Sequence, residues 1–144
     1  MKYCCITGPA GIGKSHALAH RPVSDEVQIV DLLETIKPEI QRGTKALVLD
    51  HADCEPDAAK ALVTQAEELD LEYACLVGCE PSDLDSIVPG VSWELDIRFS
   101  GGFQDLVIEI CSNGKKARYT TDDLPRQVEG IDGFLSQIRQ DLAA

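Results

Sequence analysis

The chain has 144 residues and a formal net charge of −12, with 44% hydrophobic and 26% charged residues. This length and composition are typical of one globular domain, so we expect residues 1–144 to form a single domain. The acidic excess argues against broad, nonspecific nucleic-acid binding, which needs a basic face, and no apolar stretch is long enough to cross a membrane. The first residues lack the long apolar core of a secretory signal, which predicts a cytoplasmic protein without membrane partners.

The first half of the chain alternates short apolar segments with segments of helical periodicity. We expect strands at residues 2–7, 27–30, 45–50 and 72–78. We expect helices at residues 13–20, 32–42 and 54–70, and a short helix or turn at 80–88. Pro38 lies inside one of the helical segments and can break or kink it. Continuous apolar strands that alternate with helices indicate a parallel sheet covered on both faces.

After residue 90 the pattern changes to consecutive strands. Residues 91–99 alternate like a strand, "SGG" turns the chain, and residues 103–111 run back. The pair Asn113-Gly114 favours a tight hairpin into a last strand at 116–120. The closing segment, 130–144, carries an apolar helical stripe of Ile131, Phe134, Leu135, Ile138 and Leu142. We therefore expect an α/β domain with a mainly parallel sheet, an antiparallel meander that extends one edge, and a C-terminal helix.

The cysteines fit a reduced protein better than a metal cluster. Cys4, Cys5, Cys75 and Cys111 lie inside apolar runs, where a cysteine behaves as a small buried hydrophobe. The spacing of residues 54, 75 and 79 lacks paired C-x-x-C elements, so we expect no metal to be held by these three cysteines.

The segment "GPAGIGKS", which begins at Gly8, lies between the first strand and the first predicted helix and matches G-x-x-x-x-G-K-[ST]. Gly8, Gly11 and Gly13 allow a loop to wrap closely around phosphate groups, and the helix that follows adds free N–H groups and a positive dipole. Lys14 would reach the β- and γ-phosphates, and the Ser15 hydroxyl would bind Mg²⁺. The residues that we expect to contact the nucleotide are Gly8, Pro9, Ala10, Gly11, Ile12, Gly13, Lys14, Ser15 and His16. A chance match in a strand-to-helix turn is the alternative.

A second segment, "ALVLD", ends at Asp50, which a parallel sheet would place at the same edge as the glycine-rich loop. Together the two segments resemble the Walker A and Walker B segments of P-loop NTPases, in the branch that includes AAA+ and RecA-like ATPases. The strand series after residue 90 is similar in layout to a RecA-like core. The resemblance implies a three-layer P-loop fold, ATP and Mg²⁺ as ligands, Asp50 beside Ser15 at the metal, and Lys14 and Asp50 as catalytic residues. The alternative for Asp50 is a structural place at the start of the turn "DHAD".

The residue that would orient the attacking water has several candidates. Many ATPases of this branch place Glu directly after the Walker B Asp, where this chain has His51, and the departure speaks against fast hydrolysis. A neutral His can still act as a base. RecA-like proteins carry the acidic residue that orients the water near the end of the second strand, which makes Asp31 and Glu34 candidates. Asp53 and Glu80 are further candidates, and Glu80 also matches the region of a γ-phosphate sensor. Each of these carboxylates could instead cap a helix or be solvated.

An arginine finger would stabilise charge on the transferring phosphoryl group, and Arg98, Arg118 and Arg126 are the candidates, with a surface role as the alternative. Arg98 and Arg118 also fall close to Lys115 and Lys116 and form a local basic patch. We interpret this patch as the solvated face of a hairpin.

The base of the nucleotide is predicted to be adenine, because no Asn-Lys-x-Asp segment for guanine is present. Trp93, Tyr73 and Tyr119 suit core or edge-strand positions better than stacking on adenine.

These observations predict a Mg²⁺-dependent ATPase of minimal RecA-like type, a small motor or accessory factor in nucleic-acid metabolism. The nucleic-acid part is implied by the resemblance alone, with DNA or RNA reached through a partner or a homo-oligomer. One alternative is an ATP-sensing regulatory module with little hydrolysis, which His51 favours. A small-molecule kinase is the other alternative, and the absence of arginine from residues 78–90 counts against it.

Overall fold

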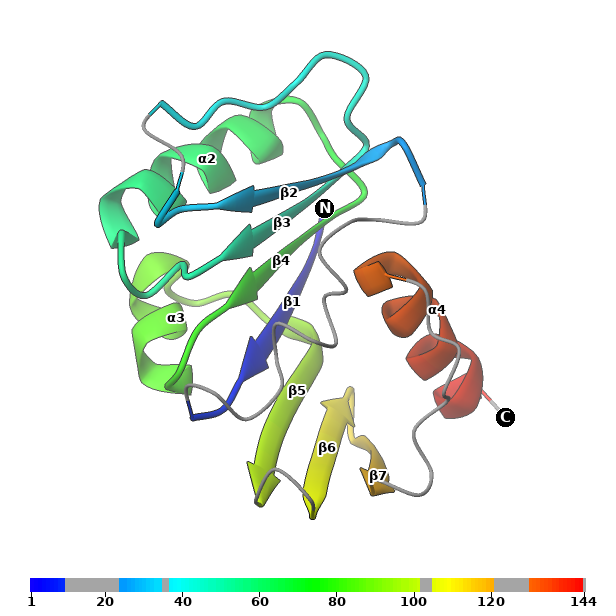
Figure 1. Ribbon diagram of the computed structural model, residues 1–144. Helices are drawn as coiled ribbons and strands as arrows, with labels where there is room; N and C mark the ends of the chain where they lie inside the picture. The colour runs from blue at the N-terminus through cyan, green and yellow to red at the C-terminus, as the bar shows by residue number, and fades with distance from the viewer. Residues whose placement is uncertain (10–23, 35–36, 102–104, 121–129, 144) are drawn as a thin grey trace.

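The computed structural model describes residues 1–9, 24–34, 37–101, 105–120 and 130–143. Within these residues, one seven-stranded sheet carries helices on both of its faces (Figure 1). The α/β class expected from the sequence, with a mainly parallel sheet and a C-terminal helix, is confirmed.

The sheet has the strand order β2-β3-β4-β1-β5-β6-β7. Its strands are β1 (Lys2–Thr7), β2 (Val27–Asp31), β3 (Ala46–Asp50), β4 (Tyr73–Val77), β5 (Trp93–Gly101), β6 (Leu106–Ser112) and β7 (Lys115–Thr120). The first five strands are parallel, and β6 and β7 are antiparallel to their neighbours. The continuous apolar sequences of β1, β3 and β4 fit strands that are buried on both faces.

The edge of the parallel part differs from the prediction in two details. β5 pairs parallel with β1, so the antiparallel meander begins only at β6. A helix connects β4 to β5, and such a crossover lets the chain return in the parallel direction. Ser100 and Gly101, predicted to turn the chain, instead continue β5 and pair with Val107 and Leu106. The predicted hairpin between β6 and β7 is confirmed, since Asn113 and Gly114 both have positive φ, 49° and 83°.

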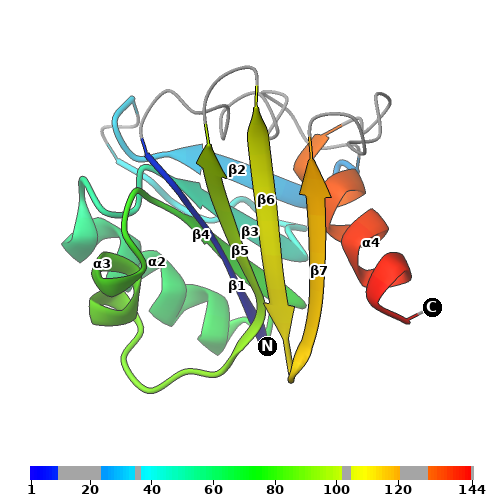
Figure 2. The ribbon, with the colours of Figure 1, turned by 90° about the horizontal axis from the view of Figure 1, so that it is seen from below.

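Three helices pack on the sheet in the described part of the chain: α2 (Pro56–Glu68), α3 (Pro81–Ile87) and α4 (Gly130–Ala143). Helices α2 and α3 cover one face, and α4 lies on the opposite side (Figures 1 and 2). None of them combines the length and apolar character that crossing a lipid bilayer requires.

The alternation of side chains along the strands divides the core into two layers. On one side, strand residues such as Ile6 and Ile97 pack with the apolar stripe of α4. On the other side, Leu47 and Leu76 pack with α2 and α3. The helix residues buried in these layers are Ile131, Phe134, Leu135 and Ile138 of α4, Ala59, Leu62, Val63 and Ala66 of α2, and Leu84 and Ile87 of α3.

The predicted helix at 32–42 is wrong where the structure describes this segment. The residues after β2 form a turn, and the described residues from 37 to 44 are not helical. The Gln28 side chain holds this segment, because its Nε2 donates to Glu39 O (2.9 Å) and its Oε1 accepts from Gln41 N (2.8 Å) and Thr44 Oγ1 (3.1 Å). These bonds satisfy backbone groups outside a helix, and Pro38 favours the same outcome. The predicted helix at 13–20 lies outside the described residues.

The burial of Cys111 was predicted wrongly. Cys4, Cys5 and Cys75 are buried as expected, but Cys111 is exposed. It lies on β6 next to Ile110, which packs in the layer of α4. Adjacent residues of a strand point to opposite faces, so Cys111 points to the face of β6 that lies away from α4.

Candidate functional site

The carboxyl ends of the parallel strands form the candidate site. β1 ends in Thr7, β2 in Asp31 and β3 in Asp50, all at one edge of the sheet. β1 and β4 lie side by side near the middle. In the strand order, β2, which follows β1 in the sequence, lies on the β4 side of β1. β5, which follows β4 and α3 in the sequence, lies on the opposite side of β1. In open α/β sheets, ligands bind at the carboxyl edge where the connections diverge in this way.

Gly8 occupies a tightly packed place at this point. It is buried, with φ +151°, and its N–H donates to Cys79 O at 3.2 Å. A Cβ atom on Gly8 would lie 2.7 Å from Phe99 O and 2.8 Å from Phe99 Cβ. Since real side chains do not approach so closely, the close contact between the end of β1 and β5 requires glycine. Pro9 is exposed, and the predicted phosphate-binding residues from Ala10 to His16 lie outside the described residues.

Asp53 ties the ends of β3 and β4 together. Its Oδ2 accepts a hydrogen bond from Cys79 N at 3.0 Å, and the neighbouring Ala52 N donates to Val77 O at 2.9 Å. Gly78 N, one residue past β4, donates to Ile6 O at 3.0 Å. These bonds fix the backbone at the carboxyl ends of β1, β3 and β4. The contact of Asp53 with Cys79 N is therefore structural.

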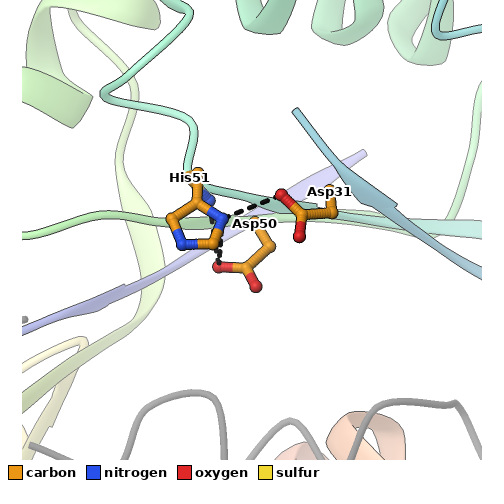
Figure 3. Close-up of side chains that lie close together, drawn as sticks. All are labelled: Asp31, Asp50 and His51. Carbon is orange, nitrogen blue, oxygen red and sulfur yellow. Dashed lines mark hydrogen bonds and ion pairs between the residues drawn. The ribbon is translucent and has the colours of Figure 1, made fainter. Parts of the chain in front are cut away.

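A cluster of three polar side chains lies at the ends of β2 and β3 (Figure 3). Asp31 and Asp50 are register partners on these adjacent strands. His51 follows with φ +57°, and its Nδ1 lies 2.8 Å from Asp31 Oδ1 and 3.7 Å from Asp50 Oδ1. The exposed fractions of the side chains are 16% for Asp50, 31% for Asp31 and 37% for His51. The cluster is therefore open to solvent on one side.

Backbone donors orient both carboxylates of this cluster. Leu33 N donates to Asp31 Oδ1 at 3.0 Å, and His51 N donates to Asp50 Oδ1 at 2.9 Å. One ligand atom from each of the three side chains lies within 4.8 Å of the others. Two carboxylates and an imidazole at this spacing can hold a divalent cation.

Asp31, Asp50 and His51 were each identified from the sequence as candidate site residues, but no sequence pattern predicted that the three side chains contact one another. The available signal was that two successive apolar strands each end in Asp. That signal becomes informative only once β2 and β3 are known to be neighbours in register.

Two other predicted acids lie apart from this cluster of side chains. Glu34 is exposed, and its backbone N donates to Asp31 O at 3.2 Å. Glu80 is exposed at the N-terminal cap position of α3, where its side chain makes no capping hydrogen bond.

The predicted basic patch contains acidic side chains as well. Arg98, Glu109 and Arg118 are register neighbours on β5, β6 and β7. Arg98 also donates to both carboxylate oxygens of Asp96, at 3.2 and 3.1 Å. Lys115 Nζ donates to the backbone oxygen of Leu142 at 3.2 Å. This interleaving agrees with a solvated hairpin face, and Arg126 lies outside the described residues.

The three aromatic candidates occupy core or edge positions, as expected. Tyr73 is buried, and Trp93 and Tyr119 are half-buried and pack against the two core layers. Trp93 Nε1 also donates to Asp85 Oδ1 at 3.0 Å.

Comparison of the chain with protein-family models, with curated proteins and with solved structures finds no match.

Proposed function

We propose that the chain is a Mg²⁺-dependent ATP-binding protein of minimal RecA-like P-loop type with slow ATPase activity. One observation carries the proposal: Gly8, where "GPAGIGKS" begins, follows β1, and Asp50, where "ALVLD" ends, is the last residue of β3, so both lie at the carboxyl ends of parallel strands in one sheet. Only β4 separates these strands, so they are about 10 Å apart. The loop also begins at the divergence of connections where α/β sheets bind ligands.

The carboxylates of Asp31 and Asp50 are the type of ligand that Mg²⁺ prefers. Mg²⁺ prefers oxygen ligands, and Asp50 offers a largely covered carboxylate beside that of Asp31. In the proposed site, Asp50 and the Ser15 hydroxyl hold the metal, and Lys14 and the loop N–H groups hold the phosphates. Bound Mg²⁺ would neutralise negative charge on the terminal phosphates.

Slow turnover is proposed because of the residue that follows Asp50. A glutamate there would offer a free carboxylate to a water molecule, whereas the His51 imidazole lies against Asp31. This contact favours a protein that binds ATP and hydrolyses it slowly. It also supports the second candidate function, an ATP-sensing module that changes a partner surface.

The proposed role in nucleic-acid metabolism depends on the resemblance alone. The patch at β5–β7 alternates acidic and basic side chains, so we propose that DNA or RNA is reached through a partner or a homo-oligomer.

The test compares ATP binding and phosphate release for the native chain, Lys14→Ala and a control, Lys60→Ala, on the exposed side of α2. We expect Lys14→Ala to weaken Mg²⁺-ATP binding at least about tenfold, or about 1.4 kcal/mol, with an unchanged melting temperature. The control should bind ATP like the native chain. Equal ATP affinity of Lys14→Ala and the native chain would refute the phosphate assignment.

Two additions to the phosphate-release assay separate the candidate functions. Stimulation by DNA or RNA supports a motor or accessory factor, and tight binding with no turnover supports the sensing module. Transfer of phosphate to a metabolite supports the kinase alternative.

A further inference from the structure

We propose that Asp31, Asp50 and His51 form a direct binding site for a divalent transition-metal ion of the Mn²⁺ type, which is occupied without nucleotide. The site uses the two carboxylates and the imidazole Nδ1 as ligands. It differs from the magnesium assignment above, in which Asp50 acts with Ser15 and the nucleotide.

The distances between the ligand atoms suit a single ion. Ligands bonded at about 2.1 Å to one metal lie about 3.0 Å apart at right angles and about 3.4 Å apart in a tetrahedron. The separations from His51 Nδ1, 2.8 Å to Asp31 Oδ1 and 3.7 Å to Asp50 Oδ1, fall on either side of these values. One ligand atom of each residue lies within 4.8 Å of those of the other two residues, so small side-chain rotations suffice to bring the three residues around an ion.

The combination of ligands selects the class of metal. Carboxylates suit Mg²⁺, Ca²⁺ and Mn²⁺, whereas imidazole suits transition metals and is a poor ligand for Mg²⁺. Ions that accept both ligand types include Mn²⁺, Fe²⁺, Co²⁺ and Zn²⁺. The two carboxylate charges balance the charge of such an ion, and His51 adds a neutral donor.

The backbone holds the ligands in place before any ion binds. The N–H groups of Leu33 and His51 fix one oxygen of each carboxylate. The left-handed conformation of His51, with φ +57°, accompanies an imidazole that lies against both acids (Figure 3). Such outer contacts orient ligands and raise metal affinity.

Metal binding changes the position of one hydrogen atom. When Nδ1 donates to Asp31, its hydrogen lies between the two ligand atoms. A metal-bound Nδ1 must offer its lone pair, and the neutral ring then carries its hydrogen on Nε2. The Nδ1–Asp31 hydrogen bond is replaced by bonds from both atoms to the ion.

The experiment titrates the full chain with Mn²⁺ in the absence of nucleotide. Mn²⁺ is preferred to Zn²⁺ because the chain has six cysteines, which bind Zn²⁺ as thiolates. Free Mn²⁺ is measured from its electron paramagnetic resonance signal, and electron spin-echo modulation reports a coordinated nitrogen. We expect one Mn²⁺ per chain with nitrogen coupling. His51→Gln should abolish the coupling, and both His51→Gln and Asp31→Asn should weaken binding by about tenfold or more.

Two control variants separate this site from the nucleotide site. Asp83→Asn removes an exposed carboxylate of α3, and Lys14→Ala removes the proposed phosphate ligand; both should bind Mn²⁺ like the native chain. Absence of nitrogen coupling, or equal Mn²⁺ affinity of His51→Gln and the native chain, would overturn the inference. If ATP binding still depends on Lys14 in that case, the proposed function stands without the transition-metal site. If Mn²⁺ binds as expected but Lys14→Ala binds ATP as tightly as the native chain, the metal site stands and the proposed function fails.

Discussion

Asp31 and Asp50 are register partners on adjacent parallel strands, so their carboxylates lie side by side at the edge of the sheet. Like charges in neighbouring positions destabilise a sheet. Here each carboxylate accepts a backbone N–H, and the imidazole of His51 lies against both. These contacts offset the repulsion, and the same arrangement brings three metal-binding side chains together.

Asp31→Asn should leave the fold intact while it weakens metal binding. The asparagine oxygen can still accept from Leu33 N, and the substitution removes one of two neighbouring negative charges. We therefore expect the free energy of unfolding to change by less than about 1 kcal/mol. Urea denaturation measures this change. Asp31→Ala, which also removes the acceptor, should cost about 1 kcal/mol more. A loss of several kcal/mol in the asparagine variant would show that Asp31 is mainly structural.

Gly8→Ala should destabilise the protein strongly. The added Cβ would lie 2.7 Å from Phe99 O, a backbone atom of β5 that cannot move without disturbing the sheet. Together with the positive φ of Gly8, this collision should cost about 2–4 kcal/mol in the free energy of unfolding.

Gly43→Ala is the matched control for this substitution. Gly43 has φ +90°, and a Cβ there would meet no atom within 4 Å. It should therefore cost only the backbone strain, about 1 kcal/mol. Equal losses for the two variants, measured by denaturant unfolding, would mean that the contact between Gly8 and Phe99 is not tight.

Local sequence patterns predicted the elements whose stability is local. The helix at Pro56–Glu68 shows its apolar face in the sequence, and Asn113-Gly114 marks the hairpin through its backbone preference. The segment after β2 also has apolar residues at helical spacing but forms no helix where it is described. Its backbone is held by Gln28, on the preceding strand, and no periodicity within the segment reports that contact.

The candidate site was predictable only in part for the same reason. Asp50 was identified from its place at the end of an apolar strand, and His51 from the type of residue expected directly after Asp50. The contact between His51 and Asp31 depends on which strands are adjacent and on their register. The sequence alone contained neither. The exposure of Cys111 likewise depends on which face of β6 the helix α4 covers.

Five of the six cysteines should separate into two classes when a disulfide reagent is added. Burial is the main cause that raises the pKa of Cys4 to about 12, and it also raises the pKa of Cys5 and Cys75. The thiolate is the reactive form, so these three should react only when the protein unfolds. The exposed Cys54 and Cys111 should react in the native protein.

The two exposed thiols should also differ in rate. Partial desolvation and the neighbouring Asp53 raise the pKa of Cys54, so Cys111 should react first. Cys111→Ser should remove the fastest phase of the reaction followed by absorbance, whereas Cys4→Ser should leave the native phases unchanged. A fastest phase that persists in Cys111→Ser would contradict its assignment to Cys111.

Glu94 should make the protein less stable in acid through its contact with α4. Its carboxylate accepts from Arg139 Nε at 2.9 Å and pairs with Lys2 Nζ at 3.1 Å. Partial burial raises the pKa of Glu94, but the hydrogen bonds and charges of Arg139 and Lys2 lower it more, so the net pKa lies below the ordinary 4.5. A carboxyl whose pKa is lower in the folded state stabilises the fold above its unfolded pKa. That stability is lost as the pH falls through the folded pKa.

We therefore expect the free energy of unfolding of the native chain to fall more steeply below about pH 4.5 than that of Glu94→Gln. The measurement is a series of urea denaturations between neutral pH and acid. Glu68→Gln, on the exposed side of α2, is the matched control and should keep the native profile. Arg139→Met should flatten the profile as well, because it removes the main partner of Glu94 and with it the cause of the low pKa. Parallel profiles for the native chain and Glu94→Gln would mean that the ion pair does not join α4 to the sheet in solution.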